Sequence, residues 1–458
     1  MKATTNNIVI FPRIALRVAI LAALTVVLTQ VAYAGSATWL ASPPTGNWNH
    51  AANWTPATVP NGPSDTATFA TSNTTSVSLS ANTEVNGIVF NAGASGFTIA
   101  VAPTLILTVS GAGIVNNSGV AQNFVTVVDS AGNIGSTVFS NSATAGSLAA
   151  FTNNGGTVSG ASGGITRFSD TSTAGNAALI ANGGTNGGKG GLIRFDGKST
   201  GGTARVEVFG NGSLDISPHS HSGVKIGSIE GDGVIFLGDN NLSVGTNKQL
   251  SSTFSGKIKD GGISGGTGGS LTKVGGKRMT LATASTYTGG TTIKNGTLYV
   301  SNQSGSGTGT GPVQVNGGSL RGNGTIFGPM TVGNGNRDAD FTPQSPQTNT
   351  GILTIKNTLT FNPLSDYQWV IDSMTGAISR VVAAGVTINS NASFFAYDPI
   401  PAKLPTGTVL TAIENTSANP IAGTFSNLAD GSTFILRFNT LKVDYQGGDG
   451  NDLTLTVQ

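Results

Sequence analysis

His219 and His221 have the residue type and the spacing of a metal-binding pair. Residues two apart on an extended strand point to the same side, so two imidazoles could face one ion. Asp215, Glu230 and Asp232 are near enough in the sequence to supply a third ligand. However, the flanking proline, serine and glycine residues favour a solvated loop, and two histidines alone make a weak site. We therefore assign no metal to this segment.

The run Arg337-Asp338-Ala339-Asp340 places two carboxylates at positions i and i+2. Paired carboxylates could cleave a glycosidic bond by acid–base chemistry. The run follows Gly333-Asn-Gly-Asn336, which indicates a surface loop, and a general acid needs burial or a close neighbour to tune its pKa. No serine lies in a Gly-x-Ser-x-Gly elbow with a plausible histidine partner. The sequence therefore predicts no catalytic residue.

The segment Gly447-Gly-Asp-Gly-Asn-Asp452 matches the first six positions of the calcium-binding nonapeptide. Such loops bind calcium between stacked copies, and the chain has one copy. Its apolar position is also out of phase, because Thr454 stands where the core residue should be and Leu453 does not. We expect a hairpin turn into the final strand, with no calcium held by Asp449 or Asp452.

Three tryptophans, Trp39, Trp48 and Trp54, lie close together near the start of the chain. Exposed indole rings could stack on sugars. A repeat protein, however, must close its open end, where core residues would otherwise meet water. We favour this capping role for the three rings.

The composition excludes several classes of protein. The chain of 458 residues has no Cys, so it has neither disulfides nor a thiolate metal site. Charged residues are 10% of the chain, against about 25% in typical soluble domains, which excludes long charged helices. The 67 Gly follow no three-residue period, which excludes collagen. Abundant Gly, Asn, Ser, Thr and small aliphatic residues suit short strands and tight turns.

Residues 1–34 have the features of a secretory signal peptide. A basic start with Lys2, Arg13 and Arg17 precedes an apolar run and an Ala-x-Ala site before Gly35. Without these three positive charges the mature chain has 20 basic and 21 acidic residues, a net charge of −1. No Lys or Arg occurs over 35–166, so nucleic-acid binding is not expected. No later apolar run is long enough to span a bilayer as a helix.

Short runs of alternating apolar residues recur along the mature chain, and many end in Asn-Gly turns. The pattern continues for about 420 residues without a linker-like break. Stacked coils also explain the low charge, because like charges placed above one another would repel. The sequence thus predicts an all-β solenoid, and two or three separate β-sandwiches are the alternative.

Residues 269–300 resemble the autotransporter-associated β-strand repeat, also called the passenger-associated transport repeat. The motifs that carry the resemblance stand at the spacing of that family: Leu271-Thr-Lys273, Leu281, Tyr287-Thr-Gly-Gly-Thr-Thr292 and Asn295-Gly-Thr-Leu298. Similar segments follow at Gly311-Pro-Val313, Gly318-Ser-Leu320 and Gly423-Thr-Phe425. The resemblance implies a right-handed parallel β-helix and an extracellular or cell-surface location in bacteria.

Six apolar residues of this repeat are expected to point inward from successive strands: Leu271, Met279, Leu281, Ile293, Leu298 and Val300. We expect the ring of Tyr287 to cover the corner at Gly289-Gly290. In that family a membrane β-barrel ends the chain. Here the sequence stops at Gln458, so we expect no barrel.

We predict four segments: a signal peptide over 1–34, an N-terminal β-helix region over 35–266, a repeat-like β-helix over 267–362 and a β-rich C-terminal cap over 363–458. At ~20 residues per coil and ~4.8 Å per strand, the solenoid would extend on the order of 90 Å.

The expected function is that of a secreted or cell-surface structural or adhesive protein without catalysis. We predict no catalytic, cofactor-binding or metal-binding residue and no cofactor. A surface polysaccharide or another cell-envelope component is the expected partner. The chain is expected outside the cell or at the outer membrane, with the periplasm as the alternative. Two other functions stay open: a polysaccharide lyase or hydrolase built on a β-helix, and a carbohydrate-binding surface protein.

Overall fold

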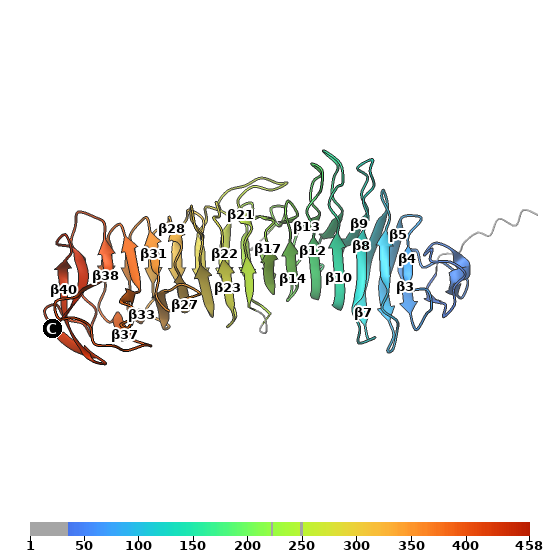
Figure 1. The fold of residues 1–458 in the computed structure, drawn as a ribbon. Helices are drawn as coiled ribbons and strands as arrows, with labels where there is room; N and C mark the ends of the chain where they lie inside the picture. The colour runs from blue at the N-terminus through green and yellow to red at the C-terminus, as the bar shows by residue number, and fades with distance from the viewer. Residues whose placement is uncertain (1–34, 221–222, 248–250) are drawn as a thin grey trace, which may run out of the picture.

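The computed structural model describes residues 35–220, 223–247 and 251–458. It is an elongated stack of short strands that run across its long axis (Figure 1). Consecutive coils pair in parallel through most of the chain, as the predicted all-β parallel β-helix requires. The structure confirms this fold class. In the described part of the chain, no helix is both long enough and apolar enough to cross a membrane.

Four sheets run along the stack. The N-terminal sheet has the order β2 (Trp54–Thr55), β1 (Ala37–Trp39), β3 (Gly62–Phe69), β5 (Thr83–Phe90), β7 (Ile106–Asn116), β9 (Ser136–Phe139), β11 (Ile165–Phe168), β13 (Leu192–Phe195), β15 (Ser213–Asp215), β18 (Val234–Phe236), β21 (Lys257–Lys259). A short 3-10 helix, η1 (Ala51–Asn53), lies beside its first strands.

The long sheet extends through almost all coils. Its order, from the N-terminal end, is β4 (Ser76–Ser78), β6 (Thr98–Val101), β8 (Gln122–Thr126), β10 (Ser147–Asn153), β12 (Asn176–Ala181), β14 (Arg205–Val208), β17 (Ser228–Gly231), β20 (Ser252–Phe254), β23 (Arg278–Leu281), β25 (Thr297–Val300), β27 (Gly318–Gly322), β30 (Ala339–Pro343), β33 (Ser365–Asp372), with β37 (Ser393–Tyr397) and the antiparallel β34 (Ala377–Ile378) both on β33.

Two further sheets begin later in the chain. The central sheet has the order β16 (Val224–Ile226), β19 (Asn241–Val244), β22 (Ser270–Lys273), β24 (Thr291–Ile293), β26 (Val313–Val315), β29 (Met330–Val332), β32 (Leu359–Phe361), β36 (Val386–Ile388). The C-terminal sheet has the order β28 (Thr325–Ile326), β31 (Ile352–Ile355), β35 (Arg380–Ala383), β38 (Val409–Asn415), β41 (Asp452–Val457), β40 (Asn439–Gly447), β39 (Thr433–Leu436).

The long sheet has 15 strands, of which only β34 pairs antiparallel, and so it marks 14 turns of the solenoid. Along this sheet, partner residues on successive strands are 19 residues apart at the shortest coil, Arg278 to Thr297, and 29 at the longest, Ser147 to Asn176. Most coils are therefore longer than expected. At ~4.8 Å per step the stack extends on the order of 60 Å, shorter than predicted.

In-register pairing stacks like residues in the core. Phe139, Phe168 and Phe195 occupy the same position on β9, β11 and β13. Their ring centroids are 4.9 Å apart at both steps, with planes 10° and 11° from parallel. This spacing equals the distance between neighbouring strands, so each ring packs flat on the next. The six residues predicted to point inward from the repeat are all buried, which confirms that alternation.

Three indole rings close the N-terminal end. Trp39, Trp48 and Trp54 are all buried, and each packs against Phe69 at centroid distances of 5.9, 5.6 and 5.5 Å. Each indole N–H donates to a backbone carbonyl, of Thr74, Pro60 and Trp48 respectively. The capping role is confirmed, and rings so deeply buried offer no platform for sugars.

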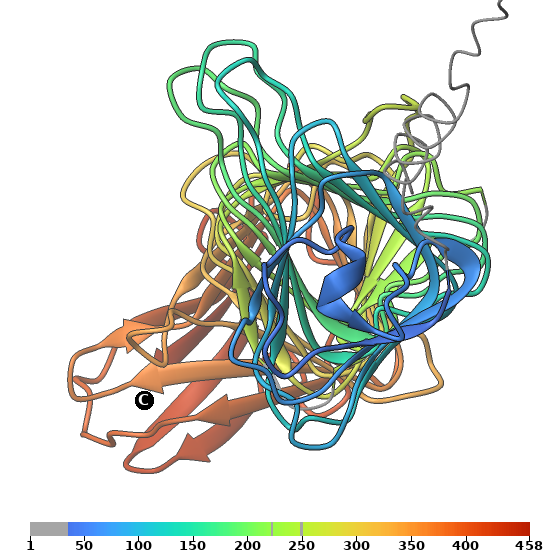
Figure 2. The ribbon, with the colours of Figure 1, turned by 90° about the vertical axis from the view of Figure 1, so that its right-hand side faces the viewer.

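The C-terminal end is closed by a change of strand direction. β38 pairs in parallel with β35, and the edge beyond it is filled by the antiparallel strands β41, β40 and β39. Phe425 covers the last core rings, with its centroid 5.2 Å from Phe361 and 5.7 Å from Phe394. These C-terminal strands, orange to red in Figure 2, project to one side of the coil. The long sheet itself runs across both predicted divisions, at 266/267 and 362/363.

Candidate functional site

The structure places His219 in the wall of the solenoid. Its Nε2 lies 2.9 Å from the carbonyl oxygen of Ser199, and its side chain is buried. His221 lies outside the described residues, so the predicted pairing is not observed. Of the nearby acids, Asp215 accepts hydrogen bonds from backbone N–H groups of Ser217 and Ile263. Within the described ranges, no group of three His, Asp or Glu side chains could hold a metal ion.

The acidic segment before the last strand forms the predicted hairpin turn. It joins β40 to β41, which pair antiparallel. Asp452 Oδ1 accepts the backbone N–H of Asn415 at 2.8 Å, so this carboxylate ties the turn to β38. Burial raises the pKa of Asp452. Through its hydrogen bond to the Asn415 N–H, Asp452 stabilises the C-terminal cap.

The carboxylates of the Arg337–Asp340 run are divided between two environments. Asp338 is exposed in the loop, whereas Asp340 lies half-buried in β30. The expected surface loop therefore contains Asp338, whereas Asp340 belongs to a strand. Asp340 instead pairs across the sheet with Asp366 of β33.

Two rows of side chains face outward from the C-terminal coils of the long sheet. We name the first the amide row: it takes one residue from each of five successive strands, Tyr299, Arg321, Thr342, Gln368 and Phe395. The second, the carboxylate row, lies two residues earlier on the same strands: Thr297, Ser319, Asp340, Asp366 and Ser393. At ~4.8 Å per step, each row is about 19 Å long.

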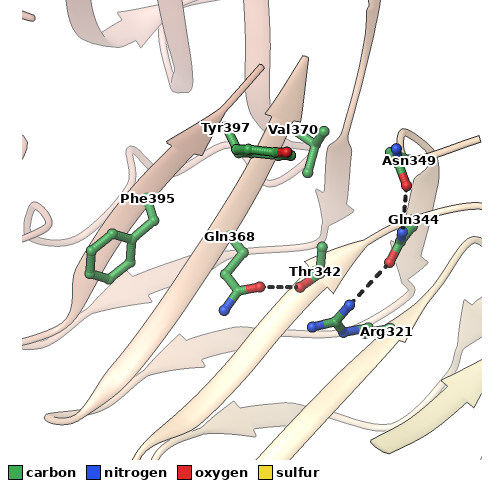
Figure 3. A pocket seen from close by; sticks show the side chains of 8 residues that line it. All are labelled: Arg321, Thr342, Gln344, Asn349, Gln368, Val370, Phe395 and Tyr397. Atoms are coloured by element: carbon green, nitrogen blue, oxygen red, sulfur yellow. Dashed lines mark hydrogen bonds between the residues drawn. The ribbon is translucent and has the colours of Figure 1, made fainter. Parts of the chain in front are cut away.

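A cavity of about 390 Å³ opens on the amide row (Figure 3). Its lining consists of Arg321, Thr342, Gln344, Asn349, Gln368, Val370, Phe395 and Tyr397. In Figure 3 the two aromatic rings lie on one side and Arg321, Gln344 and Asn349 on the other, with Gln368 and Thr342 between them. Phe395 and Tyr397 are 51% and 56% exposed, although they belong to a strand that is otherwise packed on β33.

Hydrogen bonds hold the polar wall of the cavity in place. Arg321 Nη1 donates to Gln344 Oε1 at 3.5 Å, and Gln344 Nε2 donates to Asn349 Oδ1 at 3.3 Å. The Thr342 hydroxyl donates to Gln368 Oε1 at 3.2 Å. The Gln368 side chain also hydrogen-bonds to the Asp340 carboxylate, for which its Nε2 group is the donor, so one further N–H of this amide is left for a ligand.

The cavity continues in both directions along the face. A second cavity of about 200 Å³ shares Arg321 and Gln344 and extends past Tyr299 to Arg278. A third, of about 330 Å³, shares Asn349 and extends to Ile400. The hydroxyl of Tyr299 donates to the carbonyl of Gln344, which anchors the loop over 344–350. We call the three cavities together the outer groove.

Charges are divided along this face. Arg278 and Arg321 lie toward the N-terminal coils, and Asp338, Asp340 and Asp366 toward the C-terminal ones. Burial raises the pKa of Asp340, Arg321 lowers it and Asp338 raises it further. The pKa of Asp366 is raised by burial first, and then by the charges of Asp340 and Asp338. Asp372 lines the third cavity, so the face carries two arginines and four aspartates, a formal charge of about −2, and it presents both signs of charge to a ligand.

Two residues of the repeat motif serve the fold. The Lys273 ammonium donates to the carbonyls of Val274, Gly275 and Asn295, at 2.5, 2.8 and 3.3 Å. The Tyr287 ring is fully buried, and its hydroxyl lies 2.5 Å from Thr291 Oγ1. Tyr287 therefore packs inside the coil, and its hydrogen bond to Thr291 spans the corner at Gly289-Gly290.

The sequence did not point to the outer groove. Its residues are spread over about 120 positions, from Arg278 to Ile400, and no two of them form a motif. The available signal was the pair Phe395 and Tyr397, two aromatic residues that alternate with Phe394 and Ala396. Such alternation puts one set of rings inside and the other outside.

No family model matches this chain, and a search of curated proteins found no relative. The family resemblance of the repeat therefore remains a prediction.

Proposed function

We propose that this protein is an exported, non-catalytic β-solenoid that acts as a structural or adhesive element at the cell surface. The observation that carries the proposal is the unbroken stack of 14 turns, closed by aromatic plugs at both ends. Closed ends prevent end-to-end association through open edges, so the sides of the stack are left for recognition.

Export is proposed from the sequence of residues 1–34, and the surface location from the repeat resemblance. The proposed partner is a surface polysaccharide or another component of the cell envelope. An open groove on the outer face, in place of an enclosed cleft, supports binding over chemistry, because general acids work best where water is excluded.

Cell fractionation tests this proposal. Cells that produce the full chain are separated into cytoplasm, envelope and medium, and the protein is probed and sequenced from its N-terminus. We expect a mature chain that begins at Gly35 in the envelope or the medium. An uncleaved chain in the cytoplasm would refute export.

A second function, polysaccharide cleavage, is favoured by one observation. Asp340 and Asp366 lie side by side on adjacent strands, whose spacing of ~4.8 Å allows the close carboxyl pair of ~5 Å that retaining glycosidases use. Purified residues 35–458 should be incubated with a broad panel of polysaccharides. We expect no cleavage. Turnover that is abolished in both Asp340→Asn and Asp366→Asn would establish the enzyme instead.

A further inference from the structure

We propose that the outer groove binds a segment of a neutral polysaccharide chain, laid along the axis of the solenoid. This inference rests on the proposed adhesive function and names its ligand and its site. It is carried by the shape of the groove, by its pairing of aromatic and amide side chains, and by its charge.

The shape fits a chain better than a small molecule. The three cavities form one path, because each pair of them shares lining residues: Arg321 and Gln344 for the first and second, Asn349 for the first and third, and Pro346 for the second and third. This path crosses the strands from β23 to β37, and successive strands present the same side-chain position at each step. A ligand with a repeating unit can then make similar contacts at each coil.

The side chains match the two surfaces of a sugar ring. One surface of a hexose consists of C–H groups, which pack on exposed aromatic rings such as those of Phe395 and Tyr397. The rim of a hexose carries hydroxyls, which both donate and accept hydrogen bonds. Gln368 gives one N–H of its amide to Asp340 and offers the other, directly beside Phe395 in the amide row. Aromatic and amide groups thus lie within one sugar unit of each other.

The charge of the face selects a neutral chain. Arg321 already donates to Ser319 Oγ and to Gln344, and the field of Asp340 partly compensates its charge. An acidic polymer would then meet Asp340 and Asp366 on the neighbouring row, and a cationic polymer would meet Arg278 and Arg321. An uncharged chain avoids repulsion by the aspartates and by the arginines.

A protein strand is a poorer occupant of this face. The free edge of β37 is capped by Asn427, whose side-chain amide accepts from the Phe394 N–H and donates to the Phe394 carbonyl, both at 2.8 Å. Ser426 donates to the Ala392 carbonyl beside it. An added strand would find the hydrogen-bonding groups at this end of the edge already paired.

The test is affinity electrophoresis of residues 35–458 in gels that contain one polysaccharide each, followed by calorimetry on any polymer that retards the protein. The panel includes neutral glucans, mannans, galactans and xylans, a uronate polymer and an amino-sugar polymer. The variants are Phe395→Ala, Tyr397→Ala and Gln368→Ala. Phe438→Ala is the matched control, because Phe438 is 66% exposed and lies outside the groove. Thermal melting shows that each variant is folded.

We expect at least one neutral polymer to retard the protein, and each groove variant to weaken its binding by about tenfold. The control variant should bind like the wild type. The inference is overturned if no neutral polymer binds, if only charged polymers bind, or if binding survives in all three folded groove variants. A surface-exposed protein that binds no glycan would refute this inference alone, whereas a cytoplasmic chain would refute the proposed function.

Discussion

Lys273 is a buried lysine, 2% exposed, whose charge the fold holds with three backbone carbonyls. These carbonyls belong to the turns of two successive coils. Lys273→Met keeps the apolar stem but leaves the acceptors unpaired, so we expect the free energy of unfolding to fall by about 2 kcal/mol or more. Lys277→Met, at an exposed position four residues further along the chain, should change the free energy of unfolding by less than about 0.5 kcal/mol. Urea unfolding of both variants measures the difference; equal stabilities would show that Lys273 contributes only its stem.

The buried tyrosines predict an upper pH limit for the fold. Burial raises the pKa of Tyr299 and Tyr445 to about 12, and it raises those of Tyr287 and Tyr367 as well. Because these folded-state values exceed the ordinary value of 10.0, their stabilisation is complete below pH 10 and is lost as the pH rises through 12.

Lys273 acts in the opposite direction. Burial lowers its pKa from 10.5 to about 8, so between these values the unfolded chain binds more protons and stability rises with pH. We therefore expect the melting temperature to hold or rise between pH 8 and 10 and to fall steeply above. Circular dichroism melts and tyrosinate absorbance measure this. Ionisation of all the tyrosines near pH 10 in a folded protein would contradict the account.

At the residue scale, the sequence predicted the interior better than the surface. Alternation alone identified the inward residues from Leu271 to Val300, because burial of apolar side chains decides which face of a strand points inward. The partners of the amide row were not predictable. Along the long sheet, coil lengths vary between 19 and 29 residues, so no fixed period aligns Arg321 with Thr342 or Gln368 with Phe395.

The C-terminal elements from β38 to β41 protect the last coil. Phe425 lies over the rings of Phe361, Tyr367 and Phe394, and the hydroxyl of Tyr445 bonds to the backbone of Phe425 and Leu428. Residues 35–403 lack this cover and expose the edge of β35. We expect this truncated chain to associate in light-scattering experiments at concentrations where residues 35–458 stay monomeric.

Full-length Phe438→Ala is the control for this comparison, since it alters an exposed ring of the cap and leaves the last coil covered. If residues 35–403 stay monomeric with an unchanged melting temperature, the segment after 403 is an independent domain with another task.

At the element scale, turn residues and alternating apolar runs predicted the strands. The tryptophan cluster predicted the closure of the N-terminal end of the solenoid. The sequence could not show that the N-terminal sheet ends at β21 while the central sheet begins at β16. Both kinds of strand have the same alternation, and which sheet a strand joins depends on where the corners of its coil fall. Similarly, Asp340 looked like part of a glycine-rich loop, because the strand begins only one residue before it.

At the scale of the whole molecule, the fold class could be predicted from the composition and from the unbroken repetition of short strands and turns. A long chain of short strands with few charges has few other ways to bury its apolar faces. The outer groove did not follow, because it is assembled from seven strands and the loops beside them, which come together only in the stack. A groove on the outside of the stack can meet an envelope polysaccharide only if the protein lies at the cell surface, so a measurement of its location decides the proposed function.

The absence of cysteine makes that measurement direct. Ile435→Cys places a single thiol at a position that is 76% exposed in the cap, and Leu320→Cys places one in the core at 0% exposure. Intact cells that produce each variant are treated with a membrane-impermeant maleimide, and the protein is then isolated. We expect Ile435→Cys to be labelled on intact cells and Leu320→Cys to be labelled only after denaturation. Labelling of Ile435→Cys only after the cells are lysed would contradict a surface protein.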